Sequence, residues 1–211
     1  MNKRFILLLV VAVVVGVLFG YSSMLQGEFY QIVEFFKELV ARDERTAMMV
    51  FVLLSALTAL ISPLTNIPLV PFAVALWGSE LTVVLILLGW LLGDIVAYII
   101  GRYLGYATIS YIFSREHIDG WSGVVKKHTN FTRALFARFV FPAELGYAFG
   151  IIKYNFSHYL AITFLAELPF ALVSAYASEA VLAGDMIKFL WLTGVLFAII
   201  FLAFRSLHKK S

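Results

Sequence analysis

The fold is decided by residues 47–80, AMMVFVLLSALTALISPLTNIPLVPFAVALWGSE, where two apolar arms flank a proline-rich break. The first arm, 47–61, has 15 residues, fewer than the about 20 that a transmembrane helix needs. Pro63, Pro68 and Pro71 prevent a regular helix between the arms. Irregular backbone at membrane depth is tolerated where protein or a water-filled cavity covers it. The pattern therefore predicts a re-entrant hairpin.

The composition of the whole chain supports a membrane protein. Of its 211 residues, 62% are hydrophobic and 14% are charged, and the mean hydropathy is +0.94. A soluble domain is about 45–50% apolar and about 25% charged. These values exclude a soluble enzyme, a disordered chain and a nucleic-acid-binding domain. The net charge of +3 then indicates a cytoplasmic bias of basic loops, with no nucleic acid as a partner.

Four further apolar runs are long enough to span a bilayer. They are 5–25, 81–103, 156–182 and 186–204. A second broken run, 134–154, contains Pro142 and predicts a second hairpin. Residues 26–46 have the spacing of an amphipathic helix, either on the membrane surface or against the protein's own extramembrane face. Residues 114–133 are the most polar stretch and are expected to form a loop.

Together these runs predict an all-α integral membrane protein with about four transmembrane helices and two opposed re-entrant hairpins. Its expected parts are residues 1–46 (a span and the amphipathic helix), 47–182 (a core with both hairpins) and 183–211 (a last span and a basic tail). This layout places eleven Lys and Arg residues inside and four outside. That bias favours cytoplasmic termini, although six shorter spans would also place both ends inside.

The two halves of the core carry a faint internal repeat. The spacings between its anchor residues are 7 and 16 in the first half, and 8 and 17 in the second. The anchors are Pro71, Gly78 and Asp94, followed by Pro142, Gly150 and Glu167. Because one hairpin starts outside and the other inside, the repeats would be inverted. Paired broken segments in two halves point to a transporter's site at the midplane, unless the match is a coincidence.

Four charged residues lie inside apolar segments: Asp94, Arg138, Glu144 and Glu167. Unpaired, they would together cost roughly 10 kcal/mol in a bilayer. We therefore expect them to meet each other or water in the protein interior. In a functional interpretation Arg138 binds an anionic head group, while Asp94, Glu144 and Glu167 exchange protons or gate access. In a structural interpretation Arg138 only neutralises one of these acids.

The motifs of enzymes are missing from the sequence. There is no nucleophile–base pair, no Walker A motif and no cysteine, and the four histidines lack the spacing of metal ligands. We therefore expect neither an enzyme nor a cofactor, with coupling to protons or sodium left open. The Gly89/Gly93 and Gly101/Gly105 spacings favour close helix packing over a ligand site.

The stretch 89–105, GWLLGDIVAYIIGRYLG, resembles the G-x-x-x-G-D/A-x-x-x-Y-x-x-G-R-x-x-G signature of the DedA family, also called the VTT or SNARE-associated domain family. The second half contains Phe136-Ala137-Arg138-Phe139, similar to the family's F-x-R-F-x-P block. The resemblance covers roughly residues 60–180. Its motif residues in the first half are Gly93, Tyr98, Gly101, Arg102 and Gly105.

The sequence departs from the family pattern at three places. Pro142 lies four residues after Arg138, where the family usually has three, and a second arginine after that proline is missing. The acidic residue frequent in the first hairpin is also absent, with Pro68-Leu69-Val70-Pro71 in its place. These departures indicate a divergent member.

The resemblance implies a lipid transporter in a prokaryotic plasma (inner) membrane. Its partners would be membrane lipids with anionic phosphate head groups, either undecaprenyl phosphate or a phospholipid, and it would act as a flippase or scramblase, with proton coupling left open. The expected substrate-binding residues are Arg138, Pro142, Glu144 and Gly150, and the expected proton-coupling residues are Asp94, Glu144 and Glu167. Alternatives are an ion or small-solute/proton antiporter, or a non-transporting scaffold. A homo-oligomer is left open.

Overall fold

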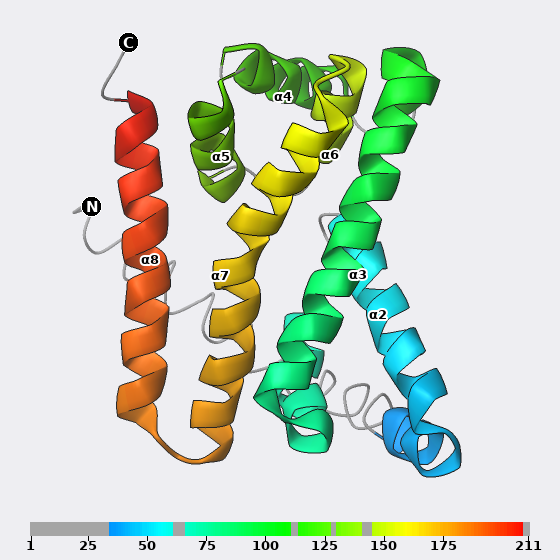
Figure 1. Ribbon diagram of the computed structural model, residues 1–211, viewed down its shortest axis with the longest axis vertical. Helices are drawn as coiled ribbons and strands as arrows, with labels where there is room; N and C mark the ends of the chain where they lie inside the picture. Colours follow the sequence, from blue (N-terminus) through cyan, green and yellow to red (C-terminus); the bar gives the residue numbers. More distant parts are fainter. Residues whose placement is uncertain (1–33, 61–65, 111–113, 128–129, 141–144, 209–211) are drawn as a thin grey trace, which may run out of the picture. The chain divides into compact units, whose positions relative to one another are not determined.

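The computed structural model describes residues 34–60, 66–110, 114–127, 130–140 and 145–208. Within these ranges the chain forms helices and no strand (Figure 1). Two compact units are separated between Ala47 and Met48, and each is described by itself. The expected all-α class therefore holds for the described chain. Pro142, Glu144 and the apolar run 5–25 lie outside the described residues.

The first unit contains a charged helical segment, residues 34–42. Lys37 pairs with Glu34 at 3.0 Å along this segment. Asp43 then ends it and caps the next helix, α2 (Glu44–Leu60), by accepting hydrogen bonds from the Thr46 hydroxyl and the Arg45 backbone N–H. The bond from Thr46 is the main cause that lowers the pKa of the exposed Asp43 carboxyl.

The proline-rich segment is followed by a 3₁₀ turn, η1 (Ile67–Leu69), and by α3 (Val70–Ile109). Positive φ angles at Gly78 (+76°) and Gly105 (+69°) break α3 into a short arm, 70–77, a long helix, 79–104, and a last turn. Pro71 lies in the first turn of the arm, where a missing backbone N–H costs least. The Asn66 side chain donates a 2.7 Å hydrogen bond to the Ser55 hydroxyl of α2, which holds the turn against that helix.

The polar stretch 114–133 is not a loop, contrary to the sequence expectation. Residues Arg115–Lys127 form a helix, α4. Ile118, Ser122 and Val125 are buried along it at spacings of four and three, which is the period of one helix face. The expectation was wrong because the many charged residues between these positions make the period of the short buried face hard to detect in the sequence.

Two short helices follow α4: α5 (Phe131–Val140) and α6 (Leu145–Ile151). At a rise of about 1.5 Å per residue, neither could cross a bilayer alone. The first has the buried Arg138 in its last turn, whereas six of the seven residues of α6 are buried. Among the described residues, this region is therefore a pair of short helices.

Two long helices complete the chain. They are α7 (Phe156–Leu182), which the Asn155 side chain caps by accepting from the His158 N–H, and α8 (Met186–His208). A turn with Gly184 at φ +72° joins them. Figure 1 shows α7 running antiparallel to both α3 and α8. Pro169 lies inside α7 without ending it.

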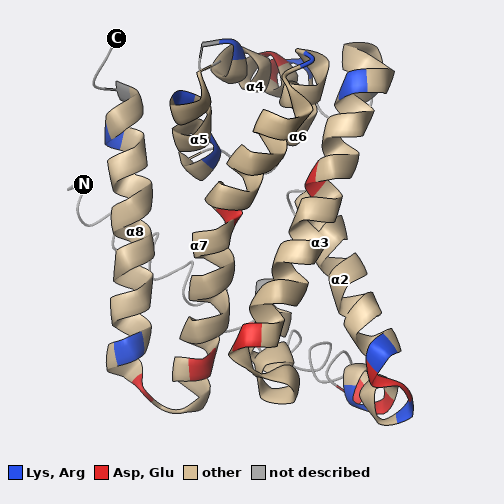
Figure 2. Cartoon of the chain, viewed as in Figure 1, with Lys and Arg blue, Asp and Glu red and all other residues tan. Residues whose placement is uncertain are grey.

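In the part of the chain that the structure describes, three helices are long and apolar enough to cross a membrane: 70–107, 156–182 and 186–207. They contain the spans expected at 81–103, 156–182 and 186–204. Figure 2 shows that charged residues gather near the ends of these long helices, with few midway. Large apolar side chains are exposed along α8, among them Ile187 at 83% and Trp191 at 66%. Such a surface suits lipid and not water.

Candidate functional site

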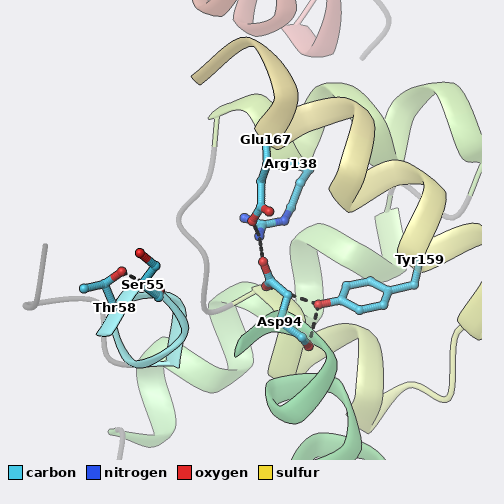
Figure 3. A network of polar contacts seen from close by, with 6 residues as sticks. All are labelled: Ser55, Thr58, Asp94, Arg138, Tyr159 and Glu167. Atoms are coloured by element: carbon cyan, nitrogen blue, oxygen red, sulfur yellow. Dashed lines mark hydrogen bonds and ion pairs between the residues drawn. The ribbon is translucent and has the colours of Figure 1, made fainter. Parts of the chain in front are cut away.

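An ion cluster lies in the middle of the second unit, where α3, α5 and α7 meet (Figure 3). One guanidinium nitrogen of Arg138, Nη2, donates to Asp94 Oδ2 at 2.7 Å and to Glu167 Oε1 at 3.0 Å. The three side chains are 5%, 1% and 11% exposed. Because burial removes the screening that weakens surface ion pairs, this cluster is held far more tightly than an exposed one.

A buried tyrosine completes the surroundings of Asp94. Tyr159 lies on α7, and its hydroxyl is 2.9 Å from the Asp94 carbonyl oxygen and 3.2 Å from Asp94 Oδ1. A hydroxyl has one proton to donate, so the two Asp94 oxygens share it. Together, Tyr159 and Arg138 hold the Asp94 side chain from two sides (Figure 3).

Part of the cluster has hydrogen-bonding capacity left over. Arg138 Nε, Glu167 Oε2 and Thr163 Oγ1 are buried and have no hydrogen-bond partner within the described residues. Buried polar atoms are normally paired, and each exception needs a reason. Within the described residues, the Arg138 Nε–H and one Glu167 oxygen therefore have no partner beside an existing ion pair.

Glycines let α6 pack closely on α3 and beside the cluster. A Cβ at Gly146 of α6 would lie 2.8 Å from the Tyr159 hydroxyl and 3.1 Å from Asp94 Oδ1. A Cβ at Gly101 of α3 would lie 2.2 Å from the Tyr147 carbonyl oxygen, and one at Gly150 would lie 2.2 Å from the Tyr98 carbonyl oxygen. No larger residue fits at these contacts without a backbone shift.

The other side of α3 packs on α2 in the same manner. A Cβ at Gly89 would lie 2.6 Å from the Val52 carbonyl oxygen, and one at Gly93 would lie 2.3 Å from that of Ala56. The expected packing role of Gly89, Gly93 and Gly101 therefore agrees with the contacts. Gly105 differs, because nothing lies within 4 Å of its Cβ position and its φ of +69° breaks the helix.

A second polar network adjoins the cluster through stacked rings. Tyr98 and Tyr159 stack with centroids 4.9 Å apart. The Tyr98 hydroxyl donates to the Tyr154 carbonyl oxygen and accepts a 2.7 Å hydrogen bond from Arg102 Nη1. A continuous path of contacts thus runs from Arg102 near the end of α3 to Asp94 midway along it.

The structure brings together three of the four charged residues that the sequence predicts to meet. Arg138 pairs with Asp94 and Glu167, the two acids of the internal repeat, while Glu144 and Pro142 lie outside the described residues. Gly150 packs against α3 and offers no polar side chain to a ligand. Tyr159 was missed, because a tyrosine in an apolar run gives no sign that its hydroxyl is used.

In the described ranges, no group of three or more His, Asp or Glu side chains could hold a metal ion.

Comparison with known proteins gives one match. The model of the VTT domain family matches residues 63–180, more than half of the chain. No curated protein and no solved structure matches the chain. The matched range includes α3 to α6 and most of α7, and therefore all residues of the ion cluster.

Proposed function

The chain belongs to the VTT domain family, and we propose that it moves an anionic lipid head group between the two leaflets of a membrane. The observation that carries this proposal is the buried Arg138, which binds two carboxylates from two long helices through a single nitrogen. A guanidinium at membrane depth is a ready partner for a lipid phosphate. The Arg138 Nε–H has no partner among the described residues, which supports a role beyond neutralising the acids.

The charge count suggests how transport is coupled to protons. With all three groups ionised, the cluster has a net charge of −1, and burial penalises any net charge. One proton on a carboxylate makes the empty cluster neutral. When a singly charged phosphate binds Arg138, a second proton on the other carboxylate restores neutrality. The proposal therefore includes uptake of one proton for each negative charge bound, exchanged at Asp94 and Glu167.

The membrane arrangement that we propose follows the sequence. Residues 5–25, the long part of α3, α7 and α8 form four spans in a prokaryotic plasma membrane, with both termini in the cytoplasm. The pairs α2 with the arm 70–77, and α5 with α6, form two re-entrant hairpins. In support, positive φ angles end the second arm of each pair, at Gly78 and at Lys153. Gly78 precedes the long part of α3 and Lys153 precedes α7, and these two helices run antiparallel (Figure 1).

The test is lipid flip in proteoliposomes that contain a fluorescent phospholipid or a labelled polyprenyl phosphate, with quenching of the outer leaflet. We expect wild-type protein to flip lipid and to respond to a pH gradient. Arg138→Ala should abolish flip. Because that change leaves two buried acids without a cation, a neutral-cluster variant, Asp94→Asn with Arg138→Gln and Glu167→Gln, is needed as well. It keeps the shape and should fold, yet flip nothing.

The matched control is Arg133→Gln, an exposed arginine on the same helix as Arg138. It should flip lipid at the wild-type rate. Flip by the folded neutral-cluster variant would contradict the role of Arg138. No flip by folded wild-type protein with either lipid would favour the solute antiporter or the scaffold.

A further inference from the structure

A pocket of about 690 Å³ opens where α3 ends and α7 begins. Its polar lining includes the side chains of Arg102, Lys153 and Ser157. Neither Arg102 nor Lys153 forms an ion pair with a carboxylate in the described part of the chain. Two unpaired cations that share one pocket make it a site for an anion. The volume is within the range of small-molecule sites, about 300–1,000 Å³.

Lys153 holds a backbone conformation that favours glycine. Its φ is +56°, and within the described residues it is the one non-glycine residue with a positive φ. It lies just past α6, where the N–H groups of Lys153 and Tyr154 bond to the carbonyl oxygens of Gly150 and Phe149. Glycine is the usual residue at this point of such a helix end. A strained lysine here points to a use for its ammonium group.

Arg102 is fixed in place by the Tyr98 hydroxyl. Tyr98 is 2% exposed, and its own proton goes to the Tyr154 carbonyl oxygen. Its lone pair therefore faces Arg102 Nη1 at 2.7 Å. Among the described residues this is the one hydrogen bond of the Arg102 side chain, so its other N–H groups can bind a ligand. Since Tyr154 directly follows Lys153, the same contact places both cations at one site.

Three large apolar or aromatic side chains of the pocket lining are exposed. Ile99, Tyr103 and Phe156 line it and are 45%, 77% and 39% exposed. They belong to the ends of two helices that are apolar enough to cross a membrane, so the pocket lies at head-group level. Cations beside exposed apolar side chains match a ligand with a phosphate and acyl chains.

We propose that this pocket binds the phosphate head group of an anionic membrane lipid through Arg102 and Lys153, at the membrane surface and apart from the buried cluster. The inference deepens the proposed function, because such a site would receive a head group before or after it passes Arg138. Binding itself requires no transport. The path Arg102–Tyr98–Tyr159–Asp94 connects the two sites by contacts already described.

The test is native mass spectrometry of the purified full chain in detergent, titrated with phosphatidylglycerol and, separately, phosphatidylcholine. We expect phosphatidylglycerol to bind wild-type protein and Lys153→Arg equally. Lys153→Gly and Arg102→Gln should each weaken it by about tenfold or more, the usual effect of losing a charge-assisted hydrogen bond. The exposed arginine variants Arg133→Gln and Arg205→Gln should bind as wild type does.

The melting temperature of Lys153→Gly serves as the control for folding. Lys153→Gly relieves the positive φ, so its melting temperature should equal or exceed that of wild type while its lipid affinity falls. Unchanged affinity in Lys153→Gly, or equal binding of phosphatidylcholine, would overturn the proposal. Displacement of the lipid by inorganic phosphate at the same concentration would instead identify a free-phosphate site and overturn the lipid assignment.

The neutral-cluster variant separates this inference from the proposed function. It should bind phosphatidylglycerol as wild type does, because Arg102 and Lys153 are intact, although it flips no lipid. If wild-type protein binds lipid at the pocket and flips none, the transport proposal is overturned and the proposal of a lipid-binding pocket is kept. If wild-type protein flips lipid while Lys153→Gly binds lipid normally, the proposal of a lipid-binding pocket is overturned and the transport proposal is kept.

Discussion

At the scale of single residues, Arg138 forms two ion pairs through one nitrogen atom. Replacing a buried pair as a whole is often neutral for stability, whereas removing one partner leaves an uncompensated charge. For Arg138, the loss of its charge would leave two buried carboxylates, Asp94 and Glu167, without a cation. The side chain therefore contributes to stability whatever it binds.

We predict that Arg138→Gln lowers the free energy of unfolding by about 3–5 kcal/mol, the usual cost of breaking a buried ion pair. The neutral-cluster variant should recover most of that loss, because no buried charge remains in it. Denaturant titration of the detergent-solubilised protein measures both values. Arg133→Gln on the same helix should change the free energy of unfolding by no more than about 0.5 kcal/mol. Equal stability of Arg138→Gln and Arg133→Gln would mean that the ion pairs are not formed.

The sequence was sufficient to find this cluster but not its neighbours. Asp94, Arg138 and Glu167 could be predicted to meet because an unpaired charge in an apolar segment is too costly to leave alone. No comparable rule predicts the roles of Tyr159 and Lys153. The role of Tyr159 depends on the contact between α3 and α7, and that of Lys153 depends on a backbone angle, neither of which composition reveals.

At the scale of the elements, α3 is held between two neighbours by glycines on different sides. Gly89 and Gly93 face α2, and Gly101 faces α6. At each of these glycines an added Cβ would meet a backbone carbonyl, which cannot rotate out of the way as a side chain can. Small residues at such contacts let membrane helices approach closely.

We predict that Gly101→Ala destabilises the protein by about 3 kcal/mol, since the added Cβ would lie 2.2 Å from the Tyr147 carbonyl oxygen. The matched control is Gly123→Ala in α4, where nothing lies within 4 Å of the Cβ position. That change should stabilise by up to about 1 kcal/mol, because alanine favours a helix more than glycine does. Melting temperatures measured in one detergent test both; a stable Gly101→Ala would rule out the close packing of α3 on α6.

Elements were predictable where a long apolar run defined them. The bounds of α7 and α8 agree with the sequence to within a few residues, since length and hydropathy alone decide a span. The helix α4 was missed because its buried face consists of a few residues among many charges. The break at Gly105 was also missed, as a glycine within an apolar run is equally compatible with packing and with a turn.

At the scale of the whole molecule, the proposed orientation makes a clear prediction for chemical labelling. The chain contains no cysteine, so a single introduced thiol is the one reactive site. Ala183, at the C-cap of α7 just before α8, and Ser206, in the last turn of α8, are both exposed. On intact cells a membrane-impermeant maleimide should label Ala183→Cys and leave Ser206→Cys unmodified, with both labelled after permeabilisation. The reverse pattern would place the C-terminus outside.

The positive φ of Lys153 has a practical consequence for anyone who wishes to purify this protein. Selection for heat resistance is a common route to a well-behaved membrane protein, and it rewards glycine or asparagine wherever a backbone is left-handed. Such a selection would favour glycine or asparagine at position 153. That substitution relaxes the backbone and removes the lysine ammonium group, so the most heat-resistant variant would bind an anionic lipid most weakly.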